Sequence, residues 1–139
     1  MKRQNRVILG DLQTTIPVVA ALALYFFVQP EIGPEIVIVF FAAWIAGYIL
    51  DYTITAKNPH LLRFEKNLVF PILYKKFGVM ITLLIHFTIE SLIVLMTPVL
   101  FTYDFGLAAS SVVALAFGVS HVLAYVSNCK FVKKYNTSL

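Results

Sequence analysis

The positions of the basic residues constrain this chain more than any other feature of its sequence. No lysine or arginine occurs at residues 7–56 or 77–129 of the 139-residue chain. Each of these stretches is long enough for two membrane-spanning helices of about 20 residues with a tight turn between them. The chain is 60% hydrophobic and 13% charged, whereas a soluble domain is about half apolar and a quarter charged. This composition excludes a soluble enzyme, a disordered regulator and a disulfide-stapled secreted module.

Turn-forming residues divide each stretch without basic residues into two. The segment Gln29–Glu35 contains two prolines and a glycine, and Thr97–Gly106 contains Thr-Pro followed by Thr-Tyr-Asp-Phe-Gly; both patterns are typical of helix ends and turns. The sequence therefore predicts an all-α polytopic membrane protein. We expect one integral membrane domain over residues 1–139, a four-transmembrane-helix bundle with spans at about 12–29, 35–53, 77–101 and 107–128.

The charge pattern also predicts an orientation. Both predicted turns carry acids and no bases, while the two termini and the central loop are basic. Because basic loops stay on the inner side of the membrane, we expect the N-terminus, the C-terminus and the central loop to be cytoplasmic. The basic residues are expected to contact anionic lipid head groups at that surface. Topology thus explains the positive charge, and no nucleic acid partner is expected.

The central loop, at about residues 58–76, alternates apolar and polar residues. Pro59 stands where a first helical residue benefits from a fixed φ. The pattern predicts a short amphipathic helix at the cytoplasmic interface, between spans 2 and 3, broken near Pro71. The alternative is a re-entry segment that only anchors the bundle.

The third predicted span contains two ionisable residues, His86 and Glu90, one helical turn apart. Steps of three and four residues place Thr82, Ile93 and Thr97 on the same stripe. An acid near the middle of a bilayer costs on the order of 2–3 kcal/mol or more to insert. We therefore expect Glu90 to face protein or a water-filled cavity.

The fourth predicted span carries small residues at every fourth position, which allow close helix packing: Ser110, Ala114 and Gly118. With the small size of the chain, this ridge predicts a homo-oligomer or a subunit of a membrane complex. The same stripe leads to His121, at a depth similar to that of His86, and Asp51 borders the same cytoplasmic half. These observations predict an intramembrane polar cluster of Asp51, His86, Glu90 and His121.

Three interpretations of this cluster remain open. It can be a buried hydrogen-bond lattice that locks the helices together. It can be a divalent metal site, because two imidazoles and a carboxylate from His86, Glu90 and His121 form a common ligand set for zinc and non-haem iron. It can also be a relay for a proton or a substrate.

The sequence contains no GxSxG, HExxH, paired CxxC or phosphate-binding glycine loop. No catalytic residue is therefore assigned. The leading prediction is a non-catalytic accessory subunit or a small transport module organised around the polar cluster. The alternative is a metal-dependent membrane enzyme acting on a lipid or small hydrophobic substrate at the cytoplasmic leaflet.

The segment Leu50–Thr55, followed by Glu65-Lys66-Asn67 and Lys76-Phe77-Gly78, resembles a family of small prokaryotic membrane proteins of unknown function. In that family an Asp near a helix end precedes threonines, and Glu-x-Asn-Pro follows in the loop; here Leu68 stands in place of the proline. The resemblance implies that Asp51, Glu65 and Asn67 belong to one cytoplasm-facing site.

The size, the four expected spans and the ending Tyr125-Val126-Ser127-Asn128 to Phe131 are similar to those of GtrA-like four-helix membrane proteins. That similarity implies a role in moving lipid-linked sugars across a membrane.

Overall fold

The computed structural model describes residues 16, 18–28, 31–63, 69–100 and 103–136. Within these ranges the regular structure is entirely helical. The first helix covers Val18–Val28, and it is followed by α2 (Pro34–Lys57), the short 3-10 helix η1 (Pro59–Arg63), α3 (Val69–Leu100) and α4 (Tyr103–Asn136). Three helical segments are long and apolar enough to cross a membrane: Pro34–Lys57, Phe70–Val99 and Gly106–Lys133. The all-α class and the membrane character predicted from sequence are confirmed at this level.

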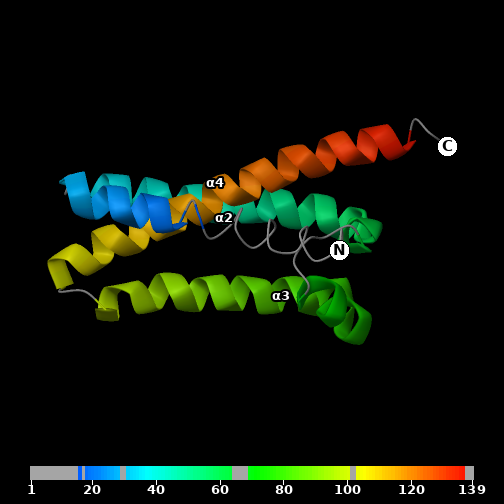
Figure 1. The fold of residues 1–139 in the computed structure, drawn as a ribbon, viewed down its shortest axis with the longest axis horizontal. Helices are drawn as coiled ribbons and strands as arrows, with labels where there is room; N and C mark the ends of the chain where they lie inside the picture. The colour runs from blue at the N-terminus through cyan, green and yellow to red at the C-terminus, as the bar shows by residue number, and fades with distance from the viewer. Residues whose placement is uncertain (1–15, 17, 29–30, 64–68, 101–102, 137–139) are drawn as a thin grey trace, which may run out of the picture.

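Helix α4 is the central element of the bundle. In α4, 56% of the apolar, membrane-length segment is buried, whereas the buried share is 22% in the corresponding segments of α2 and α3. It packs most extensively against α2, which it crosses, and then against α3, whereas α2 and α3 make few direct contacts (Figure 1). The Val18–Val28 helix covers the first half of α4, where Tyr25 packs with Ala108 and Ala109.

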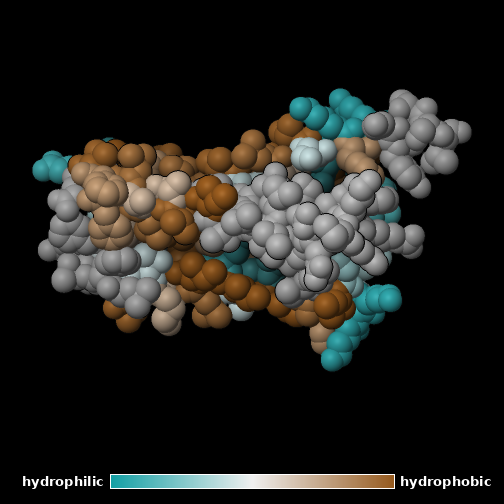
Figure 2. All heavy atoms as spheres, in the orientation of Figure 1, coloured by the Kyte–Doolittle hydropathy of each residue, from teal (hydrophilic) through white to brown (hydrophobic). Residues whose placement is uncertain are grey.

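Large apolar side chains cover much of the outer surface. Phe27 is 90% exposed, Val99 75% and Leu95 66%. Figure 2 shows hydrophobic residues over the body of the molecule and hydrophilic residues at its ends. So much exposed apolar surface is expected where helices face lipid tails.

The charged residues separate along the long axis. Helix α2 ends at Lys57, α3 carries Lys75 and Lys76 near its start, and α4 carries Lys130 and Lys133 near its end. These three helix ends lie at one end of the molecule (Figure 1). Glu31 and Glu35 lie at the other end, where α2 begins. The described basic residues therefore share one pole, as the sequence predicts.

The helices extend beyond the predicted spans. Helix α2 continues to Lys57 rather than ending at 53, and α4 covers Tyr103–Asn136 rather than 107–128. The hydropathy pattern marks only the apolar part of a helix, and backbone hydrogen bonds carry the helix on into polar sequence.

The segment predicted as one interfacial helix over 58–76 differs in the structure. Residues 59–63 form the 3-10 helix η1, and α3 begins at Val69 instead of 77. The predicted break at Pro71 is wrong, because Pro71 lies in the first turn of α3, where the missing N–H has no helical partner to lose. The interruption is at Gly78, whose φ of 76° favours glycine.

Pro98 lies inside α3, where it cannot donate a hydrogen bond to the carbonyl of Val94. The buried Ser110 of α4 fills this vacancy: its Oγ donates to the Val94 carbonyl oxygen at 2.7 Å. The close approach that this bond requires is possible because Gly106 lies against the backbone of Pro98. The small-residue ridge of α4 thus packs within the chain against α3 and, through Gly118, against α2. In this position it gives no support to self-association.

Replacing Ser110 with alanine is expected to lower the free energy of unfolding by about 1–3 kcal/mol, because the buried Val94 carbonyl loses its donor. The measurement is thermal unfolding in detergent followed by circular dichroism. The matched control is Ser111→Ala, since the Ser111 hydroxyl donates to the Ala108 carbonyl of its own helix. Its loss should cost less than about 1 kcal/mol. Equal effects of the two substitutions would contradict the assigned role of Ser110.

Candidate functional site

A buried imidazole joins two carboxylates at the centre of the bundle. Nδ1 of His121 lies 3.1 Å from Oδ2 of Asp51. Nε2 of His121 lies 3.0 Å from both Oε1 and Oε2 of Glu90. Counted over the whole residue, His121 is 7% exposed and Glu90 3%. Three helices thus supply one continuous polar contact: Asp51 from α2, Glu90 from α3 and His121 from α4.

Further groups extend this contact at both ends. Nδ1 of His86 lies 3.5 Å from Oε1 of Glu90, one turn along the same helix. Asn128 Nδ2 donates to Oδ1 of Asp51 at 3.1 Å. Trp44 Nε1 donates to Oε2 of Glu90 at 3.1 Å. We call Asp51, His86, Glu90 and His121 the polar cluster, and its two neutral donors are Trp44 and Asn128.

Close helix packing brings the polar cluster together. A Cβ atom added at Gly47 would lie 2.6 Å from the carbonyl oxygen of Gly118, and one added at Gly118 would lie 2.9 Å from the backbone of Ala43 and Trp44. Helices α2 and α4 therefore touch backbone to backbone. Asp51 follows Gly47 by one turn and His121 follows Gly118 by three residues, so their side chains meet just beyond this contact.

The cluster has few sources of positive charge. Its two carboxylates lie in stretches that contain no lysine or arginine, residues 7–56 and 77–129. Burying an uncompensated charge among apolar helices is costly. Both ring nitrogens of His121 face carboxylate oxygens. Nε2 can donate a hydrogen bond to Glu90 only if it carries a proton. The arrangement therefore requires a proton or another cation between His121 and Glu90.

Aromatic rings cover the polar cluster. The ring of Tyr48 meets that of His121 edge to face at a centroid distance of 5.0 Å. Phe87 stacks on Trp44 at 5.5 Å and packs against Tyr48 at 4.7 Å. Phe70 lies edge-on to His86 at 4.7 Å. These rings give the cluster a surrounding of low dielectric constant, which strengthens the electrostatic interactions within it.

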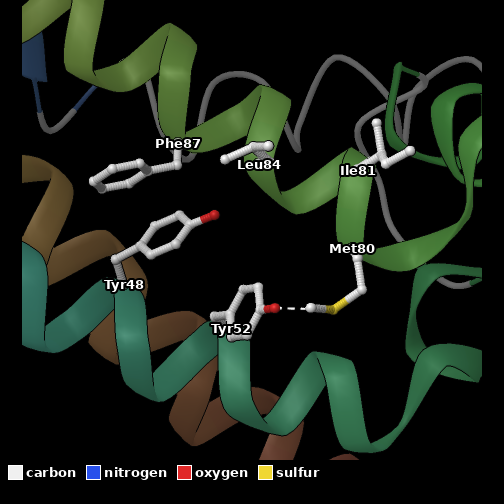
Figure 3. Close-up of a pocket in the computed structure, with 6 residues that line it drawn as sticks. All are labelled: Tyr48, Tyr52, Met80, Ile81, Leu84 and Phe87. Atoms are coloured by element: carbon white, nitrogen blue, oxygen red, sulfur yellow. Dashed lines mark hydrogen bonds between the residues drawn. The ribbon is translucent and has the colours of Figure 1, made fainter.

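A pocket of about 280 Å³ lies beside the cluster, between α2 and α3. Figure 3 shows Tyr48 and Tyr52 of α2 facing α3, with a lining of Tyr48, Tyr52, Met80, Ile81, Leu84 and Phe87. Its two phenol groups already have acceptors: Tyr48 donates to the Leu83 carbonyl at 2.6 Å and Tyr52 to Sδ of Met80 at 2.9 Å. The pocket wall is therefore apolar, and Tyr48 and Phe87 separate it from the cluster.

The structure places the residues of the predicted cluster in direct contact. The predicted stripe on α3 is wrong at one position: Ile93 is 45% exposed, while Val94 is 1% exposed and lies one turn beyond the buried Glu90. Glu65 and Asn67 lie outside the described residues. Trp44 and Tyr48 were given no role in the sequence analysis. Their spacing could have identified them, because steps of four and three residues place Trp44, Tyr48 and Asp51 on one face of α2.

The ligand atoms of His86, Glu90 and His121 all lie within 4.8 Å of one another, so these three residues could hold a metal ion. Asp51 and Trp44 contact this group from outside. The arrangement can bind a proton or a metal cation, and it can pass a proton between groups on three helices. Comparisons with models of protein families, with curated proteins and with solved structures find no match to this chain.

Proposed function

We propose that this protein is a small four-span transport module that binds a cation at its polar cluster. This proposal counts the apolar Val18–Val28 helix as part of a fourth span, in addition to the three membrane-length helices. The basic pole faces the cytoplasm, as the positive-inside rule favours, and contacts anionic lipid head groups there. Both chain termini then lie on the cytoplasmic side.

The observation that carries the proposal is the accessibility along the polar cluster. The side chains at its two ends are partly exposed, Asp51 by 20% and His86 by 26%. The two between them, His121 and Glu90, are 9% and 4% exposed. Ionisable groups that are buried in the middle of the cluster and partly exposed at its ends can exchange a proton or a cation with their surroundings, which supports a transport role.

The substitution Glu90→Gln tests this function. It keeps the shape of the side chain but removes its charge and its ability to carry a proton. We expect cation flux into proteoliposomes, measured with a pH-sensitive dye and a metal-sensitive dye, to fall by about 100-fold or more. Ser111→Ala is the control, because it changes a buried hydroxyl of α4 outside the cluster. Undiminished flux through the folded Glu90→Gln protein would contradict the proposal.

The apolar pocket favours a second candidate function, metal-dependent chemistry on a lipid or small hydrophobic substrate. At about 280 Å³ it is near the lower limit of ligand pockets, so it fits one chain or ring rather than a whole lipid. Its walls share Tyr48 and Phe87 with the cover of the cluster. Mass spectrometry of lipids that copurify with the protein, compared with a Leu84→Trp variant that fills the pocket, distinguishes this candidate.

A further inference from the structure

The spacing of the donor atoms in the polar cluster is close to that of a metal coordination sphere. His121 Nε2 lies 3.0 Å from each Glu90 oxygen, and His86 Nδ1 lies 3.5 Å from Oε1. Two ligands on one tetrahedral zinc ion, with bonds of about 2.0–2.2 Å, stand roughly 3.3–3.5 Å apart. All three ligand atoms lie within 4.8 Å of one another, so a bound ion would require the side chains to close in by roughly 1 Å.

The contacts around these atoms resemble the outer shell of known metal sites. A metal-bound histidine usually donates its second ring N–H to a carboxylate, which fixes the tautomer and the ring orientation. Asp51 occupies that position on Nδ1 of His121, and Asn128 holds Asp51 in turn. With the proton on Nδ1, the lone pair of Nε2 points at Glu90. Trp44 holds the Glu90 carboxylate from a further direction.

Charge balance favours a divalent ion. With the proton of His121 on Nδ1, both imidazoles are neutral, and the carboxylates of Asp51 and Glu90 carry two negative charges. A single proton placed between Nε2 and Glu90 leaves one negative charge among apolar helices, whereas a divalent cation leaves none. Two imidazoles and a carboxylate suit zinc, manganese and ferrous iron better than soft cuprous or hard calcium ions.

We propose that the polar cluster binds one divalent transition-metal ion through His86 Nδ1, His121 Nε2 and the Glu90 carboxylate, with Asp51 as a positioning residue. This inference rests on the proposed function and names its cation. Three protein ligands leave an open position, as in metal sites that exchange a ligand. An ion that is to be released, or a substrate that is to be bound, requires such a position.

The test is titration of the purified protein, without a polyhistidine tag, with Zn²⁺ and with Co²⁺ in lipid nanodiscs. We expect one ion per chain and the strong visible absorption of four-coordinate Co²⁺. His86→Ala and His121→Ala should each weaken binding by more than about 100-fold, and Asp51→Asn by about 10–100-fold. His60→Ala is the matched control, since the third histidine of the chain lies in η1, outside the cluster.

Circular dichroism of each variant checks that it folds, and His86→Gln replaces His86→Ala if that protein unfolds. Stoichiometric binding that survives loss of His86 and His121 overturns the metal site, as does the absence of binding by the folded protein. If no metal binds but a proton flux remains and is lost in Glu90→Gln, the metal inference fails and the transport function stands. If metal binds at the cluster but no cation crosses the bilayer, the transport function fails and the metal site stands.

Discussion

Replacing His121 with leucine is expected to destabilise the bundle by about 3–5 kcal/mol, one of the two largest single-residue effects that the structure predicts. The substitution keeps an apolar side chain of similar bulk but leaves Asp51 and Glu90 facing it without their common partner. Glu90 is 3% exposed and cannot turn to water. The measurement is the free energy of unfolding in mixed micelles, obtained by titration with a denaturing detergent.

A double-mutant cycle separates the ionic effect from lost packing. Removing both partners, in Glu90→Leu with His121→Leu, should cost less than the sum of the two single changes, because no buried charge is then left without a partner at that contact. Strict additivity of the two substitutions, or a loss below about 1 kcal/mol for His121→Leu, would show that the contact between them carries little energy.

Replacing Gly47 with alanine is the second large effect. The added Cβ would lie 2.6 Å from the carbonyl oxygen of Gly118, and this oxygen belongs to a helix backbone that cannot rotate away. Helices α2 and α4 must therefore separate, at a cost of about 1–3 kcal/mol or more. Because Asp51 and His121 lie on these two helices, cation binding should fall together with the melting temperature.

The control for this prediction is Gly33→Ala, at a glycine whose Cβ would meet nothing within 4 Å. It should leave both stability and cation binding nearly unchanged. The account of α2–α4 packing is contradicted if Gly47→Ala behaves like Gly33→Ala in both measurements.

The sequence predicts the helical class and the pole of positive charge because both depend on composition along the chain. It does not predict where the helices end, since a helix continues past its apolar window for as long as its backbone bonds are made. The sequence also does not predict the interruption of α3 at Gly78. A proline is a stronger signal for a helix break than a glycine, and Pro71 therefore drew the prediction. Pro71 lies in the first turn of α3, however, where a proline is tolerated.

The site was partly predictable for a related reason. The spacing of His86 and Glu90 places them on one helix face. An acid inside an apolar helix is costly to insert, so its position alone indicates a polar site. The contact of His121 with Glu90 and Asp51 depends instead on how closely the helices approach, which is set by Gly47 against Gly118. A tryptophan inside an apolar helix is usually a packing residue. Only the position of Trp44 opposite Glu90 identifies it as a hydrogen-bond donor.

The most direct test of a cation site among the apolar helices is infrared difference spectroscopy of the lipid-reconstituted protein, before and after the cation is added. The account predicts a shift in a carboxylate stretching band that disappears in Glu90→Gln and persists in Glu35→Gln, a change at an exposed acid where α2 begins. An unchanged carboxylate spectrum on cation addition, or the same shift in Glu90→Gln, would contradict it.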